Sequence, residues 1–275
     1  MIQVQRSLCY YRKRKDDTVV IEKLTALAEA FPTRGFDKYY AIIRLHGLTW
    51  ARSRVLRVYR QMKLCRRRKH KRRIPVRIKE PLQQQSLPNQ SYSMDFMSDA
   101  LTSGRRLRIL KVMDDCTRES LAVWCDYSIT AEKVTQILQE VIRERKAKPL
   151  QVRVDNGPEF TSHTFVNWCK KESIIIKYIQ PGRPMQNGYI ERLNRSYRED
   201  VLDAYLLESL EQARITSDEW QYAYNHLLPH DSLNKRTPVM MRESLPAATH
   251  LKHMIEHEHK VSDQQQNKQS YVLNE

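Results

Sequence analysis

The stretch "QVRVDNGPEF" (151–160) joins a strand pattern to a chemically distinctive turn. Apolar and polar residues alternate over 151–154, which predicts a half-buried β-strand. Asp155, Asn156 and Gly157 follow at once, and an acid or amide before Gly is a common signal for a tight hairpin turn. An acid at the end of a strand can instead line the crevice of an α/β sheet. The stretch therefore admits two interpretations, a hairpin or one edge of an active site.

Strand and helix patterns alternate on both sides of this stretch. Three strand patterns come first, over 91–97, 105–115 and 119–129. Helix and strand patterns then alternate over 131–145, 150–154, 164–172, 173–179 and 189–205. This order predicts an α/β fold with a mixed sheet. After residue 205 the pattern is helical, with one face formed by Ala213, Ser217, Trp220, Tyr224 and Leu227.

The net charge of +16 comes from the first third of the chain. Residues 1–80 hold 23 Lys and Arg against 6 Asp and Glu, whereas the remaining residues hold 25 and 26. Such asymmetry indicates nucleic acid, or less often an anionic membrane surface, as the partner of that third. The basic run "CRRRKHKRR" (65–73) has no apolar face to insert into lipid, so we favour nucleic acid. With no long apolar segment either, we expect a cytoplasmic protein without a membrane partner.

Helical patterns in the first 63 residues surround a short turn at Gly47 and resemble a helix-turn-helix. Val55, Tyr59 and Met62 can face inward in the helix after the turn. Four arginines of that helix then stay available to solvent or phosphate: Arg52, Arg54, Arg57 and Arg60. Three more, Arg66, Arg67 and Arg68, extend this candidate DNA-binding set. A protein-docking module of three helices is the alternative.

These patterns divide the chain into four parts. We expect a helix-turn-helix DNA-binding domain over 1–63, a basic linker over 64–90, and an α/β domain with a C-terminal helix over 91–245. The remaining part, 246–275, is polar and Gln-rich, and we expect it to be disordered.

Three acids are candidate metal ligands. Asp95 lies within an apolar strand and points away from its apolar face, which is costly unless a cation lies nearby. Asp155 ends the next central strand, and Glu191 lies near a helix start. A pair of Mg²⁺ ions held by such carboxylates can activate a hydroxyl and stabilise a leaving oxygen in phosphoryl transfer. Glu191 shares a helix face with Asn194, Arg195 and Arg198.

Other interpretations of these acids stay open. Glu191 and Arg195 have the spacing of an ordinary surface ion pair on a helix. Asp99 and Glu159 lie close to the chosen acids in the sequence. Asp114 and Asp115 fall where a strand turns, and we expect them to cap that turn.

Four segments resemble the catalytic half of bacterial insertion-sequence transposases of the OrfB type, in the DDE superfamily that includes retroviral integrases. They are "SYSMDFMSDALTSGRR" (91–106), "DNGPEF" (155–160), "QPGRPMQNGYIERLNRSYRED" (180–200) and "YNHLLPHDSLNKRTP" (224–238). In that family 35 residues separate the second Asp from the Glu, and 35 residues lie between Asp155 and Glu191. The similarity extends from about residue 7 to about Val239.

The resemblance implies an RNase H-like core in which Asp95, Asp155 and Glu191 bind two Mg²⁺ ions, with Mn²⁺ as a substitute. Such enzymes cut one strand of double-stranded DNA at an element end with water. The freed 3′-hydroxyl then attacks target DNA, within a homo-multimer that holds two ends together. Gln186 and Asn187 are expected to position the site or the DNA end. A separate upstream-frame protein is often fused by frameshifting, and the setting is the nucleoid of a bacterial cytoplasm.

Two positions depart from the family pattern. Tyr92 stands where Trp is usual, and Leu228 replaces the Arg of an Arg-Pro-His motif. The alternative function is therefore a catalytically inert or regulatory DNA-binding protein derived from a degenerate or partial transposase.

Overall fold

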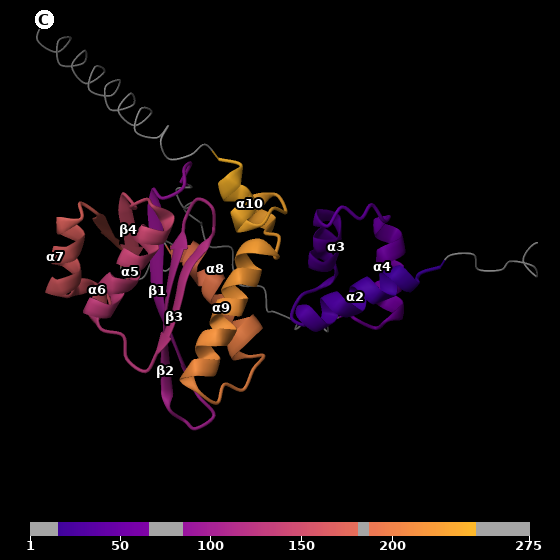
Figure 1. Ribbon diagram of the computed structural model, residues 1–275, viewed down its shortest axis with the longest axis horizontal. Coiled ribbons are helices and arrows are strands. Elements are labelled where there is room, and N and C mark those ends of the chain that lie inside the picture. Colours follow the sequence, from indigo (N-terminus) through magenta and orange to yellow (C-terminus); the bar gives the residue numbers. More distant parts are fainter. Residues whose placement is uncertain (1–15, 66–84, 181–186, 246–275) are drawn as a thin grey trace, which may run out of the picture. The chain divides into compact units, whose positions relative to one another are not determined.

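The computed structural model describes residues 16–65, 85–180 and 187–245 (Figure 1). The chain divides into two compact units, Met1–Pro75 and Val76–Glu275, and each is described by itself. The predicted tail, 246–275, lies outside the described residues. Within the described ranges, no helix combines the length and the apolar character needed to cross a membrane.

Over residues 16–65 the N-terminal unit contains three helices, α2 (Thr18–Ala30), α3 (Phe36–Leu45) and α4 (Arg52–Gln61). Their apolar faces meet in a small core that includes Leu24, Ile43 and Val55, each fully buried. Gly47 ends α3 with a φ of +77°, a conformation that glycine adopts without strain. The helical patterns and the glycine turn are therefore confirmed.

One residue of the predicted inward face lies elsewhere. Met62 follows the end of α4 and is only partly buried, and Val58 is buried in the helix instead. The helical period in the sequence continues past the point where the hydrogen-bonded helix stops, so it overestimates the buried face at the end.

The larger unit is built on a five-stranded sheet in the order β3-β2-β1-β4-β5. Its strands are β1 (Ser91–Ala100), β2 (Arg106–Asp114), β3 (Ser120–Asp126), β4 (Gln151–Val154) and β5 (Ile175–Tyr178). The first three pair antiparallel, and β4 is parallel to both β1 and β5. The mixed sheet is confirmed. Because a strand parallel to its neighbours cannot be joined to them by a two-residue turn, the hairpin interpretation of 155–157 is wrong.

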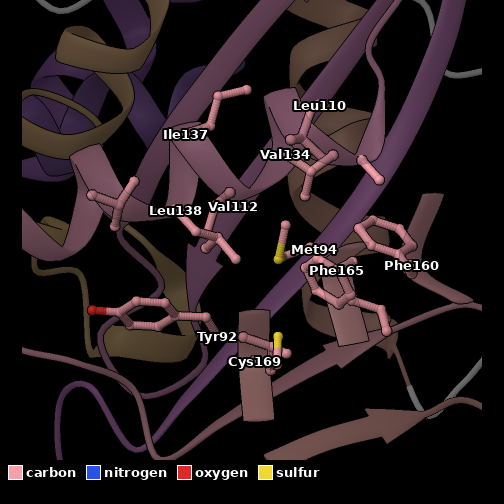
Figure 2. Packing of buried hydrophobic residues seen from close by; sticks show 14 of the residues in the cluster. Tyr92, Met94, Leu110, Val112, Val134, Ile137, Leu138, Phe160, Phe165 and Cys169 are labelled. Atoms are coloured by element: carbon pink, nitrogen blue, oxygen red, sulfur yellow. The ribbon is translucent and has the colours of Figure 1, made fainter. Parts of the chain in front are cut away.

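Helices cover both faces of the sheet (Figure 1). On one face, Tyr92 and Met94 of β1 pack with α5 (Ala131–Arg145), α6 (Pro158–Thr161) and α7 (His163–Lys171), as Figure 2 shows. On the other face, Leu107 and Ile109 of β2 pack with α8 (Gly188–Tyr197) and α9 (Leu210–His226). Asp95 alternates with Met94 and Phe96 along β1 and so belongs to the second face, as predicted.

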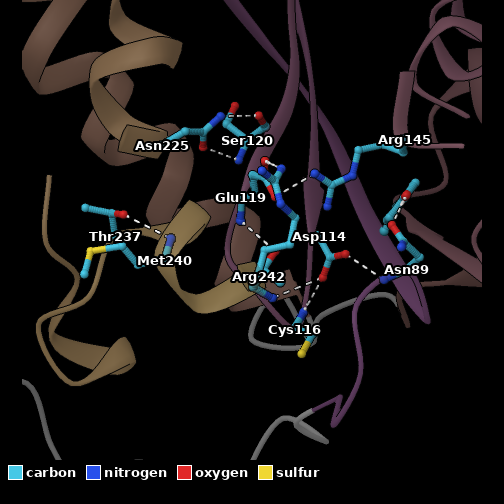
Figure 3. Close-up of polar contacts among 12 residues, drawn as sticks. Asn89, Asp114, Cys116, Glu119, Ser120, Arg145, Asn225, Thr237, Met240 and Arg242 are labelled. Carbon is cyan, nitrogen blue, oxygen red and sulfur yellow. Dashed lines mark hydrogen bonds and ion pairs between the residues drawn. The ribbon is translucent and has the colours of Figure 1, made fainter. Parts of the chain in front are cut away.

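The C-terminal helices are tied to the sheet by polar contacts around Glu119 (Figure 3). Its carboxylate pairs with Arg145 of α5 at 2.8 Å and with Arg242 of α10 (Pro238–Glu243) at 2.5 Å. Asn225 of α9 exchanges hydrogen bonds with the backbone of Ser120. These contacts connect α5, α9 and α10 to the start of β3.

The end of α9 differs from the prediction. Leu227, expected on the buried face, is 40% exposed after the last turn of the helix. Leu228 is buried instead, so the residue that departs from the family pattern packs into the core.

Candidate active site

Strand register places Asp95 and Asp155 at the same level of neighbouring strands. In the parallel pair of β1 and β4, Ser91 lies opposite Gln151 and Ser93 lies opposite Arg153. The same register continued by two residues puts Asp155, just past the end of β4, opposite Asp95. Residues at one level of parallel strands project from the same face, and such strands lie about 4.8 Å apart. The negative charge of Asp155 accordingly contributes to a raised pKa at Asp95.

Asp95 is a partly buried carboxylate held from two sides. Its Oδ2 accepts a 2.6 Å hydrogen bond from the Asn194 side chain of α8, and its Oδ1 accepts one from the backbone N–H of Phe96. Burial raises the pKa of Asp95 to about 6, although both hydrogen bonds act to lower it. A carboxylate in this position gains from a neighbouring cation.

Asp155 is exposed, and the residues after it form a compact turn into α6. The backbone N–H of Gly157 donates to Asp155 Oδ1 at 3.0 Å, and the Asn156 side chain donates to the carbonyl of Ile179. A Cβ atom at position 157 would lie 2.9 Å from Asp155 Oδ1, closer than real side chains come. A side chain at position 157 would therefore displace the Asp155 carboxylate.

Glu191 lies in the first turn of α8 and is exposed. The buried face of that helix contains Ile190, Leu193 and Tyr197, which turns Glu191 away from the core, as predicted. Within the described residues, no three acidic, His or Cys side chains form a group that could hold a metal ion. The structure thus brings Asp95 and Asp155 together and does not bring Glu191 into the same group.

The competing acids have partners within the chain. Glu159 pairs with Arg108 at 2.5 Å and Asp99 with Arg198 at 3.1 Å. Asp114 is fully buried and accepts hydrogen bonds from the backbone of the turn after β2, as predicted for a capping acid. Asp115 is also fully buried and binds serine hydroxyls of β1.

The three candidate ligands form hydrogen bonds at most and have no ionic partner among the described residues. None of the ion pairs between described residues includes Asp95, Asp155 or Glu191. The surface pair proposed as an alternative for Glu191 is also not formed, because Arg195 binds Glu199 at 3.0 Å.

Lys111 is a site neighbour that the sequence interpretation missed. It lies opposite Asp95 in the pairing of β1 with β2 and is fully buried. Its amine contacts the Met97 sulfur at 3.0 Å and lies 3.8 Å from the centre of the Tyr197 ring. Burial lowers the pKa of Lys111 to about 6, although the nearby Asp95 carboxylate acts to raise it. A single Lys within the apolar run "RILKVM" (108–113) was the available signal.

The arginines of α4 are not all available to phosphate. Arg54 and Arg57 both pair with Asp17, at 3.1 and 2.9 Å, and Arg52 pairs with Asp37 at 2.9 Å. Asp17 is mostly buried before the first turn of α2 and therefore requires cationic partners. These three guanidinium groups are therefore paired within the chain while 34 to 57% of each side chain stays exposed, and their contact with DNA stays a prediction. Arg60 is exposed and forms no ion pair within the described part of the chain.

The remaining candidate DNA contacts fall into three groups. Arg66, Arg67, Arg68 and Gln186 lie outside the described residues. Asn187 is buried at the start of α8, and its Oδ1 has no hydrogen-bond donor among the described atoms. Arg195 and Arg198 remain about half exposed beside Glu199 and Asp99.

Comparisons with known proteins agree with this architecture. The family described as "Integrase core domain" matches residues 85–184 and 172–238. The uncharacterized 31.7 kDa protein of insertion element IS407 from Burkholderia multivorans (strain ATCC 17616 / 249) is 33% identical over 240 residues, which are 86% of each chain. The uncharacterized 39.2 kDa protein of insertion element IS476 from Xanthomonas euvesicatoria is 35% identical over 217 residues, or 79% of this chain and 62% of that protein.

A solved structure shares the fold. It is the simian T-cell lymphotropic virus intasome in complex with PP2A regulatory subunit B56 gamma, with a TM-score of 0.51 and 18% sequence identity. The match covers 75% of this chain and 71% of that chain. The likeness concerns the fold alone, and it supports an RNase H-like sheet preceded by a helical region.

Proposed function

Since this chain belongs to the insertion-element transposases of the DDE and integrase superfamily, and is a DDE-type polynucleotidyl transferase, we propose that Asp95, Asp155 and Glu191 are its catalytic carboxylates. One observation carries the proposal: Asp95 and Asp155 lie level at neighbouring strands, and neither forms an ion pair within the described part of the chain. Glu191 completes the set at the family spacing, from the helix that also supplies Asn194 to Asp95.

The donor atoms of this site fit a hard divalent cation. Burial, together with the negative charge of Asp155, raises the pKa of Asp95, and a cation bound beside these carboxylates would remove that penalty; Mg²⁺ prefers such oxygen ligands. We infer two Mg²⁺ ions, replaceable by Mn²⁺, held by Asp95, Asp155 and Glu191. When bound, they would activate water or a 3′-hydroxyl and stabilise the leaving oxygen. Asn194 would keep the Asp95 carboxylate oriented, and Gly157 would leave room for Asp155.

The proposed substrate is double-stranded DNA, at element ends and at the target. Arg60, the basic run 66–68 and Arg195 and Arg198 would contact phosphates, while Gln186 and Asn187 would position the DNA end. Holding two ends requires a homo-multimer, and an upstream-frame protein fused by frameshifting would add further end recognition. The reaction would take place at the nucleoid in a bacterial cytoplasm.

Strand cleavage of an end-bearing duplex with Mg²⁺ tests the assignment. We expect Asp155→Asn to lower the cleavage rate at least about 1,000-fold, which is about 4 kcal/mol of transition-state stabilisation, while duplex binding survives. Asp126→Asn is a matched control, because Asp126 also ends a strand but pairs with Arg214. Equal cleavage by Asp155→Asn and wild type would refute the catalytic assignment. Binding without cleavage by the wild type would favour the regulatory alternative.

A further inference from the structure

A buried ion pair lies behind the two aspartates, in the loop after β2 and on β4. Asp115 is fully buried, and its Oδ2 lies 3.2 Å from the guanidinium of Arg153, whose side chain is 12% exposed. The same carboxylate accepts hydrogen bonds from the hydroxyls of Ser91 at 2.7 Å and Ser93 at 2.5 Å. The backbone N–H of Asp115 also donates to the Ser91 carbonyl. One carboxylate therefore contacts both β1 and β4.

Along β1 and β4, these contacts lie two residues before the candidate catalytic acids Asp95 and Asp155. Ser93 precedes Asp95 by two residues and Arg153 precedes Asp155 by two, and alternate residues of a strand share a face. Ser93 and Arg153 are also register partners. Asp115 thus holds the two strands together one step behind Asp95 and Asp155, on their own face of the sheet.

The pairing of β4 with β1 needs such a constraint. It extends over only three residue pairs. Burial of Val152 and Val154 resists a slip by one residue, which would turn both side chains to the opposite face. A slip by two residues keeps the same faces, so the apolar pattern does not oppose it. It would move Asp155 by about 6.6 Å along Asp95's strand, and it would also break the contact between Arg153 and Asp115.

We propose that Asp115 and Arg153 are positioning residues for the cleavage site, which set the register of β4 against β1 and thereby the separation of the Asp95 and Asp155 carboxylates. This role rests on the proposed function of those two aspartates. The pair has a second effect, because Asp115 neutralises a guanidinium that would otherwise compete with a metal ion for the carboxylates in front of it.

Metal dependence distinguishes positioning from simple stabilisation. In the full-length protein, Asp115→Asn should raise the Mg²⁺ concentration for half-maximal strand cleavage about 10- to 100-fold, as for other residues that orient metal ligands. The Mg²⁺-induced rise in melting temperature, which requires no activity, should shift to higher Mg²⁺ concentrations by the same factor. Ser93→Ala removes one hydrogen bond to Asp115 and should produce a smaller shift in the same direction.

Glu119→Gln is the matched control. Glu119 is another buried carboxylate bound to an arginine, with exposed fractions of 7% for Glu119 and 12% for Arg145, but its ion pairs go to α5 and α10. The Glu119→Gln variant should have a lower melting temperature. The Mg²⁺ concentrations for half-maximal cleavage and for the half-maximal rise in melting temperature should both stay unchanged. If Asp115→Asn fails to fold, Ser93→Ala decides the question.

The outcomes separate this inference from the proposed function. Cleavage by Asp155→Asn at the wild-type rate would refute the proposed function. If Asp155→Asn loses both cleavage and the Mg²⁺-induced stabilisation while Asp115→Asn and Ser93→Ala keep wild-type midpoints, the positioning role is overturned and the proposed function stands. Equal midpoint shifts in Glu119→Gln and Asp115→Asn would also overturn it, because a general loss of stability would then suffice.

Discussion

In α4 of the N-terminal unit, Arg54 and Arg57 both pair with Asp17, whereas on the sheet of the larger unit Asp95 and Asp155 lie level and form no ion pair with any described residue. In the sequence, the arginines of α4 form a local cluster whereas Asp95 and Asp155 lie far apart, and neither pattern shows which charges are paired. The structure distinguishes charged side chains that are paired within the fold from charged side chains that have no ionic partner among the described residues. Residues of the second kind are the stronger candidates for function, because burying or crowding them costs stability without internal compensation.

The sharpest test of this comparison is Asp95→Asn. It should lower cleavage at least about 1,000-fold, because it removes a metal ligand. Burial raises the pKa of Asp95 to about 6 in the folded protein, so the folded state binds this proton more tightly than the unfolded state does. The contribution of Asp95 to stability is therefore greatest below about pH 4 and is lost as pH rises through 6. Without metal at pH 7.5, Asp95→Asn should melt a few degrees above wild type, and the difference should vanish at low pH.

Melting curves at several pH values check this, with Asp126→Asn as control. Asp126 pairs with Arg214, so its loss should give no such increase. A higher melting temperature for the wild type than for Asp95→Asn at pH 7.5 would contradict the view that the buried negative charge of Asp95 costs stability in the absence of metal.

Gly157→Ala should have the next largest effect. The added Cβ would lie 2.9 Å from Asp155 Oδ1, so the carboxylate must move. Displacement of about 1 Å at a reacting centre can cost about 100-fold, and we expect a 10- to 100-fold slower cleavage with duplex binding unchanged. Gly35→Ala is the control, because a Cβ at Gly35 would meet nothing within 4 Å. An unaltered rate in Gly157→Ala would show that the position of Asp155 is not critical.

Asp17→Asn tests the other side of the comparison and should have the smallest effect. It releases Arg54 and Arg57 from their shared partner, so the N-terminal unit should become less stable but bind duplex DNA a few-fold more tightly at low salt. The slope of the logarithm of the binding constant against the logarithm of salt concentration should become steeper, by the amount that about one to two additional phosphate contacts produce. Glu29→Gln removes the same charge from an exposed position on α2 and should change neither property as much. An unchanged salt dependence in Asp17→Asn would mean that these arginines face away from DNA.

The sequence predicted the elements well, because strand and helix periods are local. The buried face of α8 and the outward direction of Asp95 follow from periods of 3.6 and 2. Local patterns were weakest at helix ends, where Met62 and Leu227 were assigned to buried faces.

Partners distant in the sequence could not be predicted from these periods. Arg54 lies 37 residues from Asp17, and Asn194 lies 99 residues from Asp95. Only the family resemblance predicted that Asp95 and Asp155 lie close to each other. The register between parallel strands depends on contacts between distant residues, such as that of Asp115 with Arg153, which no local pattern reveals. The fully buried position of Lys111 likewise results from packing by α8 and α9, which no local period describes.

The order of strands in the sheet has a consequence for how the protein acquires activity. The strands β1, β2 and β3 follow one another through short turns, so their contacts are local and cheap to close. In contrast, β4 reaches β1 only after the crossover through α5, and parallel pairings of this kind carry a larger loop-closure entropy. In a chain that has formed only its antiparallel strands, Asp95 is in place on β1, but Asp155 is not yet beside it because β4 has not paired with β1. On the proposed assignment, competence for cleavage therefore arrives with the longest-range pairing of the sheet, that of β4 with β1.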